Sequence, residues 1–296
     1  MSAIISTKGL TKRYGRKSAL VDVDLEVPAG VVFGYLGPNG AGKTTTIRLL
    51  VGLMRPTSGS AAIGGADTVR ARSEAQRHIG YLPGEFVGYP DLTADQYLTY
   101  LGHLRGGVDD KVRRRLIERL GVDPAVRIGA MSHGNRQKVG IVQAFMSEPD
   151  LLILDEPTAG LDPLVQREFH TLVHEAKAAG STVFLSSHVL SEVQEVADMV
   201  GILRQGRLVE VRSIDELTAR PLRHIDLVFA GAVPALDRLR QLDGVRSAHH
   251  NAKSVHIELE GSTAALLRVI APFEVTDIVS REPDLEEVFL NYYGQD

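Results

Sequence analysis

Apolar residues occur along the first two thirds of the chain in short runs that are separated by helical stretches. Residues 19–27 (ALVDVDLEV) alternate apolar with polar side chains, the pattern of a strand with one buried face. Apolar runs at 31–36 and 151–154, and the stretch 182–186 with its apolar centre at 183–185, indicate strands buried on both faces. Helical spacing at 164–179 separates the last two runs. Strand, helix and strand in this order predict an α/β fold whose parallel sheet is covered by helices.

Between these strands lies a segment with helical patterns only. Residues 95–104 and 109–120 both have helical spacing, with no strand between them. We therefore expect a helical subdomain, inserted into the α/β core over about residues 90–147. The second stretch is interpreted as presenting a solvated basic face. Its basic residues are Lys111, Arg113, Arg114, Arg115 and Arg119.

The last quarter of the chain has another order of elements. Strands are predicted at 224–229, 245–250, 254–260 and 275–279, and helices at 233–242, 264–270 and 283–292. The order β-α-β-β-α-β, before that final helix, is typical of a ferredoxin-like α+β domain. The segment contains 7 basic and 12 acidic residues, a net charge of −5, whereas the whole chain carries −4. The pattern and the acidity predict two domains, 1–220 and 221–296.

Composition narrows the class of protein. With 33 Lys and Arg against 37 Asp and Glu, the chain lacks the basic balance of a nucleic-acid binder, so no nucleic-acid partner is expected. The absence of cysteine excludes disulfides and Cys-ligated metals. Apart from His133 and His188, the histidines, with His249 and His250 among them, show no metal-ligand spacing with a partner and are interpreted as surface or structural residues. The apolar runs are shorter than the ~20 residues of a membrane-spanning helix, and no signal peptide is evident. We expect a cytoplasmic protein.

A phosphate-binding loop follows the run at 31–36. Residues 37–44 (GPNGAGKT) match G-x-x-x-x-G-K-[ST] between the strand predicted at 31–36 and a stretch of helical spacing at 44–53. Backbone N–H groups of such a loop, with the helix N-terminus, bind phosphate oxygens. Lys43 would reach the β- and γ-phosphates, and the Thr44 hydroxyl would bind Mg²⁺. The residues expected to bind ATP here are Gly37, Pro38, Asn39, Gly40, Ala41, Gly42, Lys43, Thr44 and Thr45.

Two carboxylates end the apolar run at 151–154. Asp155 is expected to hold Mg²⁺ through its water shell, and Glu156 to polarise an attacking water. Acidic residues at a strand end are common, so this pair indicates a nucleotide site only in combination with the phosphate loop.

At this point the sequence resembles the nucleotide-binding subunits of ATP-binding-cassette (ABC) transporters, over about residues 3–215. Residues 131–138 (MSHGNRQK) resemble the family signature, usually L-S-G-G-Q. The resemblance implies that this segment faces the ATP held by a second copy of the chain, where Ser132 and the N–H of Gly134 contact the γ-phosphate. The signature residues are Ser132, His133, Gly134 and Asn135.

Three further residues fall where the family has functional ones. Asp162, in the run AGLD, resembles the D-loop aspartate at the dimer interface. His188 resembles the switch histidine that contacts the γ-phosphate, which makes it a catalytic candidate beside Glu156. Tyr14 resembles the aromatic residue that stacks on adenine, and the alternative for Tyr14 is a core position in a strand.

One position departs from the family pattern. The glutamine expected after residues 81–83 (YLP) is replaced by Gly84, and Glu85 follows. Either Glu85 takes the glutamine's place at the metal, or the metal and water are held differently and Glu85 is a solvated loop residue.

The resemblance implies an ATP-binding and ATP-hydrolysing subunit that uses Mg²⁺ and dimerises with a second copy when ATP binds. It would power a separate transmembrane permease from the cytoplasmic face of the cell membrane. The S-x-G-N signature and residues 284–289 (DLEEVF) resemble subunits of bacterial drug and antibiotic exporters, which implies a drug-like or lipophilic cargo. Two alternatives are a soluble ABC ATPase acting on DNA or the ribosome, and an ATP-binding regulatory or resistance protein without a permease. The first is disfavoured, because the chain has neither a long coiled coil nor a second cassette.

Overall fold

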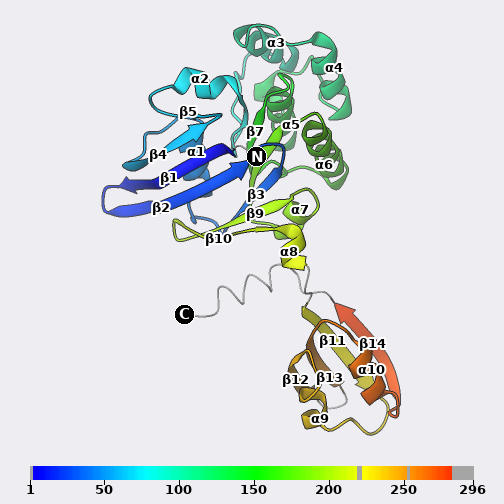
Figure 1. Ribbon diagram of the computed structural model, residues 1–296. Coiled ribbons are helices and arrows are strands. Elements are labelled where there is room, and N and C mark those ends of the chain that lie inside the picture. Colours follow the sequence, from blue (N-terminus) through cyan, green and yellow to red (C-terminus); the bar gives the residue numbers. More distant parts are fainter. Residues whose placement is uncertain (1–2, 219–221, 252–253, 282–296) are drawn as a thin grey trace. The chain divides into compact units, whose positions relative to one another are not determined.

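The computed structural model describes residues 3–218, 222–251 and 254–281. The chain divides into two compact units, Met1–Ser213 and Ile214–Asp296, and each is described by itself (Figure 1). The final helix expected at 283–292, with the 284–289 segment, lies outside the described residues. No helix in the described part of the chain is both long enough and apolar enough to cross a membrane.

A six-stranded sheet forms the centre of the first unit. Its order is β10-β9-β3-β8-β7-β6, and all neighbours are parallel except the β9–β10 hairpin. The strands are β3 (Val32–Leu36), β6 (Ile79–Leu82), β7 (Leu151–Asp155), β8 (Thr182–Ser187), β9 (Met199–Arg204) and β10 (Arg207–Ser213). Every residue of β3, β7 and β8 is buried, as their continuous apolar runs predict. The predicted α/β fold with a parallel sheet is confirmed.

A second, antiparallel sheet shares a hydrophobic core with the first sheet and with one helix. Its order is β2-β1-β4-β5, formed by β1 (Ala3–Tyr14), β2 (Lys17–Pro28), β4 (Ser58–Ile63) and β5 (Ala66–Asp67). Helix α1 (Lys43–Leu50) buries Ile47 and Leu50 in a core shared with both sheets. In that core Phe33 of β3 stacks on Phe184 of β8, with ring centroids 5.7 Å apart. The start of α1 is therefore held firmly beside the ends of these strands.

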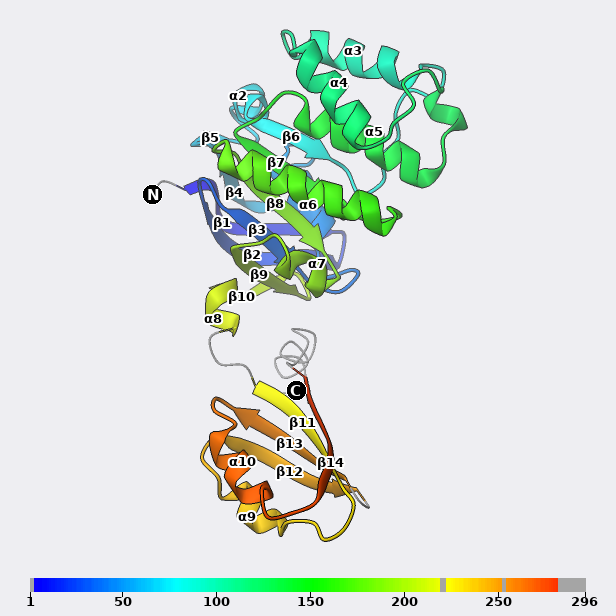
Figure 2. The ribbon, with the colours of Figure 1, turned by 90° about the vertical axis from the view of Figure 1, so that its right-hand side faces the viewer.

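Helices cover the rest of the first unit. They are α2 (Arg72–Arg77), α3 (Ala94–Leu104), α4 (Asp110–Arg119), α5 (His133–Phe145), α6 (Pro163–Ala178) and α7 (Leu190–Gln194), with a 3₁₀ turn at Ile128–Ala130. Helix α6 packs on β8, and α3 and α4 pack on α5 (Figure 2). Thr93 and Gln96 cap the start of α3 reciprocally, and the Asp109 side chain caps α4.

The basic run of α4 is not a uniformly solvated face, so that interpretation is wrong for two of its residues. Arg113 is buried, and its guanidinium donates to Asp95 Oδ1 at 2.5 Å and to Asp110 Oδ1 at 3.1 Å. Arg119 pairs with two carboxylates of α6, Glu168 and Glu175. A buried guanidinium persists only with such partners, which tie α4 to α3 and to α6.

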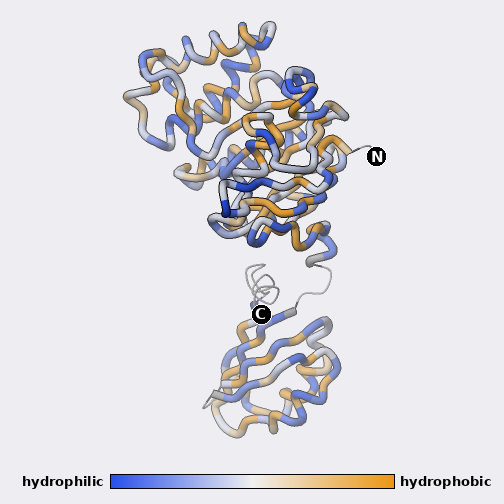
Figure 3. The backbone as a smooth tube through the Cα atoms, turned by 90° about the vertical axis from the view of Figure 1, so that its left-hand side faces the viewer, coloured by the Kyte–Doolittle hydropathy of each residue, from blue (hydrophilic) through white to orange (hydrophobic). Residues whose placement is uncertain are grey.

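The second unit begins with α8 (Ile214–Thr218) and contains one antiparallel sheet in the order β12-β13-β11-β14. Its strands are β11 (Leu222–Phe229), β12 (Val245–Asn251), β13 (Ser254–Glu260) and β14 (Val275–Arg281), with helices α9 (Leu236–Arg240) and α10 (Ala264–Ile270). Hydrophobic and hydrophilic residues alternate along β13, and buried residues alternate with partly exposed ones along most of β11 (Figure 3). Leu239 of α9 and Leu266 of α10 share a core with Ile225 and Ile257 of the sheet. Both helices thus cover one face of the sheet, and the polar residues lie on the other.

We expect Arg113→Ala to lower the free energy of unfolding by about 1–2 kcal/mol, because charge-assisted hydrogen bonds to two half-exposed carboxylates are lost. Urea denaturation measures this change. Arg114→Ala, on the exposed side of the same helix, should stay within about 0.5 kcal/mol of the unsubstituted protein. Equal effects of the two substitutions would contradict the packing role of Arg113.

Candidate functional site

The phosphate loop joins β3 to α1 and has a backbone that only glycine adopts easily. Gly40 and Gly42 have φ values of 82° and 115°, in the left-handed region. A Cβ on Gly42 would also lie 2.7 Å from the Ala19 carbonyl oxygen. Helix α1 has no side-chain cap and no acidic residue in its first turn. Its first N–H groups are therefore available for an anion.

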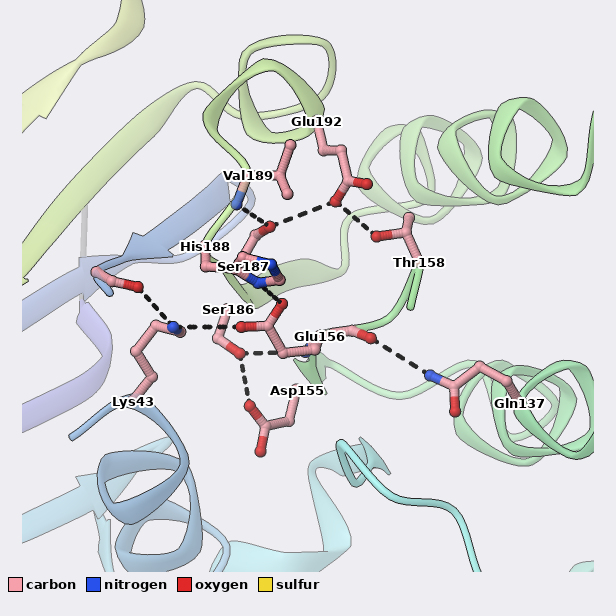
Figure 4. A network of polar contacts seen from close by, with 11 residues as sticks. Lys43, Gln137, Asp155, Glu156, Thr158, Ser186, Ser187, His188, Val189 and Glu192 are labelled. Carbon is pink, nitrogen blue, oxygen red and sulfur yellow. Dashed lines mark hydrogen bonds and ion pairs between the residues drawn. The ribbon is translucent and has the colours of Figure 1, made fainter. Parts of the chain in front are cut away.

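The Lys43 side chain is buried and lies over the loop that precedes it. Its Nζ atom donates to the Gly37 carbonyl at 2.6 Å and lies 3.2 Å from Glu156 Oε1 (Figure 4). A buried ammonium needs such partners. The arrangement holds a positive charge at the mouth of the loop, where it could bind phosphate.

Glu156 lies between two cationic or potentially cationic groups. Its Oε2 atom is 2.8 Å from Nδ1 of His188, and its Oε1 atom faces Lys43 (Figure 4). The Glu156 backbone has φ 48°, and its N–H donates to the Ser186 carbonyl and hydroxyl, both at 3.2 Å. The carboxylate is thus aimed at the phosphate loop by the end of β8.

Asp155 has the surroundings of a metal ligand. The residue is 1% exposed, and its Oδ1 atom accepts a hydrogen bond from Ser186 Oγ at 2.6 Å. The Oδ2 atom is buried and has no hydrogen-bond partner among the described residues. An unpaired buried carboxylate oxygen is costly, and a hard cation such as Mg²⁺ would satisfy it. The donor set therefore fits a metal at the end of β7.

Gly84 borders this carboxylate, whereas the side chain of Glu85 is exposed. A Cβ on Gly84 would lie 3.2 Å from Asp155 Oδ2. The position that departs from the family pattern therefore faces the candidate metal ligand directly.

The signature and D-loop segments pack against each other. Ser132 caps α5 by accepting from the Asn135 N–H at 3.2 Å. A Cβ on Gly160 would lie 2.7 Å from Cδ2 of His133. Asp162 caps α6 through the N–H groups of the second and third residues after it. Ser132, His133 and Asn135 are exposed, and none of the described contacts joins them to the Lys43–Glu156 pair.

Tyr14 is not a core residue, so that alternative is wrong. It is 48% exposed. Its hydroxyl donates to Met54 Sδ at 3.1 Å, and Lys12 Nζ lies 5.4 Å from its ring centroid. An exposed aromatic ring of this kind could stack on a planar base.

Sequence reasoning missed several residues that support the site. Ser186 bonds both carboxylate residues, and Gln137 of α5 donates to the Pro157 carbonyl at 3.2 Å. Glu192 accepts from Thr158 Oγ1 at 2.6 Å and lies 3.3 Å from Ser187 Oγ (Figure 4). In the sequence, the two serines that end the run TVFLSS (182–187) could have indicated these contacts, because hydroxyl groups in a buried strand need hydrogen-bond partners.

A phosphate loop after a buried parallel strand, with two carboxylates at the end of a nearby strand, defines an ATPase of the phosphate-loop class. Residues 20–159 match the family described as ABC transporter. The bacitracin transport ATP-binding protein BcrA of Bacillus licheniformis is 34% identical over 302 residues, 99% of this chain and 98% of that protein. The daunorubicin resistance ATP-binding protein DrrA3 of Streptomyces coeruleorubidus is 34% identical over 99% of this chain and 96% of its own length. A solved ATP-binding subunit of an ABC transporter superposes with a TM-score of 0.68 at 32% identity, over 73% of this chain and 92% of that one.

The chain therefore belongs to the ABC transporter family, as an ATP-binding subunit. As a member of this family it binds ATP and is an ATPase.

Lys43→Ala should weaken ATP binding by roughly 10- to 100-fold, because a charge-assisted contact to phosphate is worth about 1.5–3 kcal/mol. Calorimetric titration with ATP measures this affinity. Lys111→Ala removes an exposed ammonium on α4 and should leave the affinity unchanged. An unaltered affinity of Lys43→Ala would show that the loop does not hold phosphate through this side chain.

Proposed function

We propose that this ATPase powers export of a drug-like or lipophilic compound through a separate permease, from the cytoplasmic face of the cell membrane. Two relatives that match nearly the whole chain are named for bacitracin transport and for daunorubicin resistance. The proposed ATP hydrolysis rests on one observation: the Glu156 carboxylate contacts both Lys43 and His188 at the phosphate loop.

Lys43, the loop amides and the start of α1 bind the β- and γ-phosphates, and Tyr14 stacks on adenine. When ATP arrives, the Lys43 ammonium exchanges the Glu156 carboxylate for phosphate. Glu156, still bonded to His188, then holds a water and accepts its proton. The water oxygen bonds to the γ-phosphorus as the bond to the β–γ bridging oxygen breaks, giving ADP and phosphate. Such catalysis depends mainly on positioning and electrostatics.

Asp155 and the Thr44 hydroxyl would hold Mg²⁺. The ion would neutralise charge on the phosphates. The proposal rests on the buried Asp155 Oδ2 atom without a described partner. Glu85 is exposed beside Gly84. It would take the place of the family's glutamine by turning its side chain toward the ion; otherwise it is a solvated loop residue.

A second copy of the chain is proposed to complete each site. Ser132, His133 and Asn135 are exposed, and none of their described contacts reaches the Lys43–Glu156 pair of the same chain. Ser132 and the Gly134 N–H would contact the γ-phosphate held by the partner copy, and Asp162 would lie at the dimer interface. Closure of the dimer would then depend on ATP, and hydrolysis would release it.

A groove that exposes apolar side chains among polar ones supports docking of a permease. Its volume is about 830 Å³, and it is lined by α2, β6, α3 and α5 and by the segments that follow α1, α3 and α5. Leu53 and Leu104 at this groove are 55% and 65% exposed. Exposed leucines in a hollow favour a protein partner over solvent. A regulatory ATP-binding protein without a permease, the alternative function, would not need this surface.

We also propose the domain organisation of the sequence prediction, with an ATP-binding domain at 1–220 and an accessory domain at 221–296. Within the first, residues 90–147 would form the inserted helical subdomain. The division at Ser213 and Ile214 lies close to the proposed boundary. The strand order β12-β13-β11-β14 supports a ferredoxin-like fold for the accessory domain.

Glu156→Gln should lower the ATPase rate by about 10²- to 10⁴-fold, the usual contribution of a general base, while ATP binding persists. Without hydrolysis, Mg-ATP should hold a stable dimer in size-exclusion chromatography. Glu118→Gln, an exposed change on α4, is the matched control and should retain the full rate. Hydrolysis by Glu156→Gln at the unsubstituted rate would refute the assignment.

Ser132→Arg should block the composite site that the partner copy completes, whereas Lys43→Ala disables the loop of its own copy. Each homodimer should be inactive. A mixed dimer of the two variants keeps one site free of both changes, so it should regain part of the ATPase activity. No activity in the mixed dimer would argue against composite sites or would require that both sites fire together.

A further inference from the structure

Four polar residues form a cluster on the face of the second unit's sheet that the helices do not cover. In the antiparallel pairing of β11 with β13, His224 lies opposite Glu258, and Asp226 opposite His256. The residues between them, Ile225 and Ile257, are buried in the core with the helices. Since side chains alternate along a strand, the four polar residues share the opposite face.

The donor atoms of this cluster already have the spacing that an ion requires. One ligand atom from each of His224, His256 and Glu258 lies within 4.8 Å of the others, and all three residues are half-buried. His224 Nδ1 lies 3.3 Å from His256 Nε2. Two nitrogens bound to one tetrahedral Zn²⁺ at about 2.0–2.1 Å are about 3.3 Å apart.

Asp226 orients one of these donors. Its Oδ1 atom lies 2.8 Å from Nδ1 of His256. A carboxylate there keeps the imidazole proton on Nδ1, so the lone pair of Nε2 points at the cluster. Carboxylate, histidine and metal in this order are a recurrent arrangement at metal sites.

The surroundings limit which residues take part. Glu260 follows on the same face of β13, but Arg246 holds its carboxylate at 2.9 Å. His249 is the register partner of His256 on β12, yet it is not among the three residues whose atoms converge. On the other side of β11, Arg281 lies opposite His224. The cluster is thus bounded by a cation on each side.

We propose that His224, His256 and Glu258 bind a divalent transition-metal ion, with Zn²⁺ as the best match and Asp226 as a positioning residue. Two imidazoles and one carboxylate suit Zn²⁺ better than Mg²⁺, which prefers oxygen ligands alone. A fourth coordination position is left for water or another ligand. The ion would cross-link β11 and β13, and the site is independent of the phosphate loop and of the proposed export.

The test is a calorimetric titration of the full chain with Zn²⁺, after treatment with a chelator and without nucleotide. We expect one ion to bind per chain at this site. His224→Gln, His256→Gln and Glu258→Gln should each abolish or strongly weaken this binding. Asp226→Asn should weaken it about 10- to 100-fold, as outer partners of metal ligands do.

His250→Gln is the matched control. His250 pairs with Val255 rather than with a cluster residue and lies on the alternate face of β12, so this variant should bind Zn²⁺ like the unsubstituted chain. Circular dichroism and ATP titration verify that each variant is folded. Co²⁺ in place of Zn²⁺ adds a visible absorption that reports the ligands and should change in the three ligand variants.

Three results would overturn the proposal. The first is an unsubstituted chain that binds no Zn²⁺. The second is unaltered binding and Co²⁺ absorption in folded ligand variants. The third is a loss in His250→Gln equal to that in His256→Gln, which would place the ion elsewhere. Since ATP binding is measured on the same samples, failure here is distinct from failure of the phosphate-loop site.

Discussion

The parallel pairing of β3 with β8, and of β8 with β7, is the constraint on which the catalytic arrangement depends. Strands that run in the same direction end at one edge of their sheet, and ligands of open α/β sheets bind outside that edge. The phosphate loop, the two carboxylates and His188 therefore meet, although they are far apart along the chain. Burial of all three strands fixes the register that brings them together.

Most of the polar groups at this edge have a partner within the chain. Lys43 and His188 both contact Glu156, and Ser186 supports Asp155 by a short hydrogen bond. The Asp155 oxygen without a described partner is the main exception. A nucleotide would exchange one anionic partner of Lys43 for another, so the ammonium is never left unpaired. Preorganised groups of this kind need little rearrangement during the reaction.

Local patterns predicted the α/β fold and supplied the candidate site residues that the structure brings together. The phosphate loop and the pair at 155–156 could be proposed because each is continuous in sequence. Ser186 and Gln137 could not, because their partners are fixed only by strand order and by the position of α5. The burial of Arg113 depends on carboxylates from two elements. His224 and His256 are 32 residues apart, and only the register of β11 and β13 makes them neighbours.

Glu156 has a backbone conformation that its residue type disfavours. With φ 48°, a non-glycine residue carries an energetic penalty of about 1–2 kcal/mol, which glycine avoids and asparagine partly avoids. Selection for a more stable fold alone would thus remove glutamate from this position. The strained backbone turns the side chain back over the phosphate loop, between Lys43 and His188. Part of the folding free energy is lost here to orient one carboxylate, so the stability of the fold and the proposed catalytic role compete at a single residue.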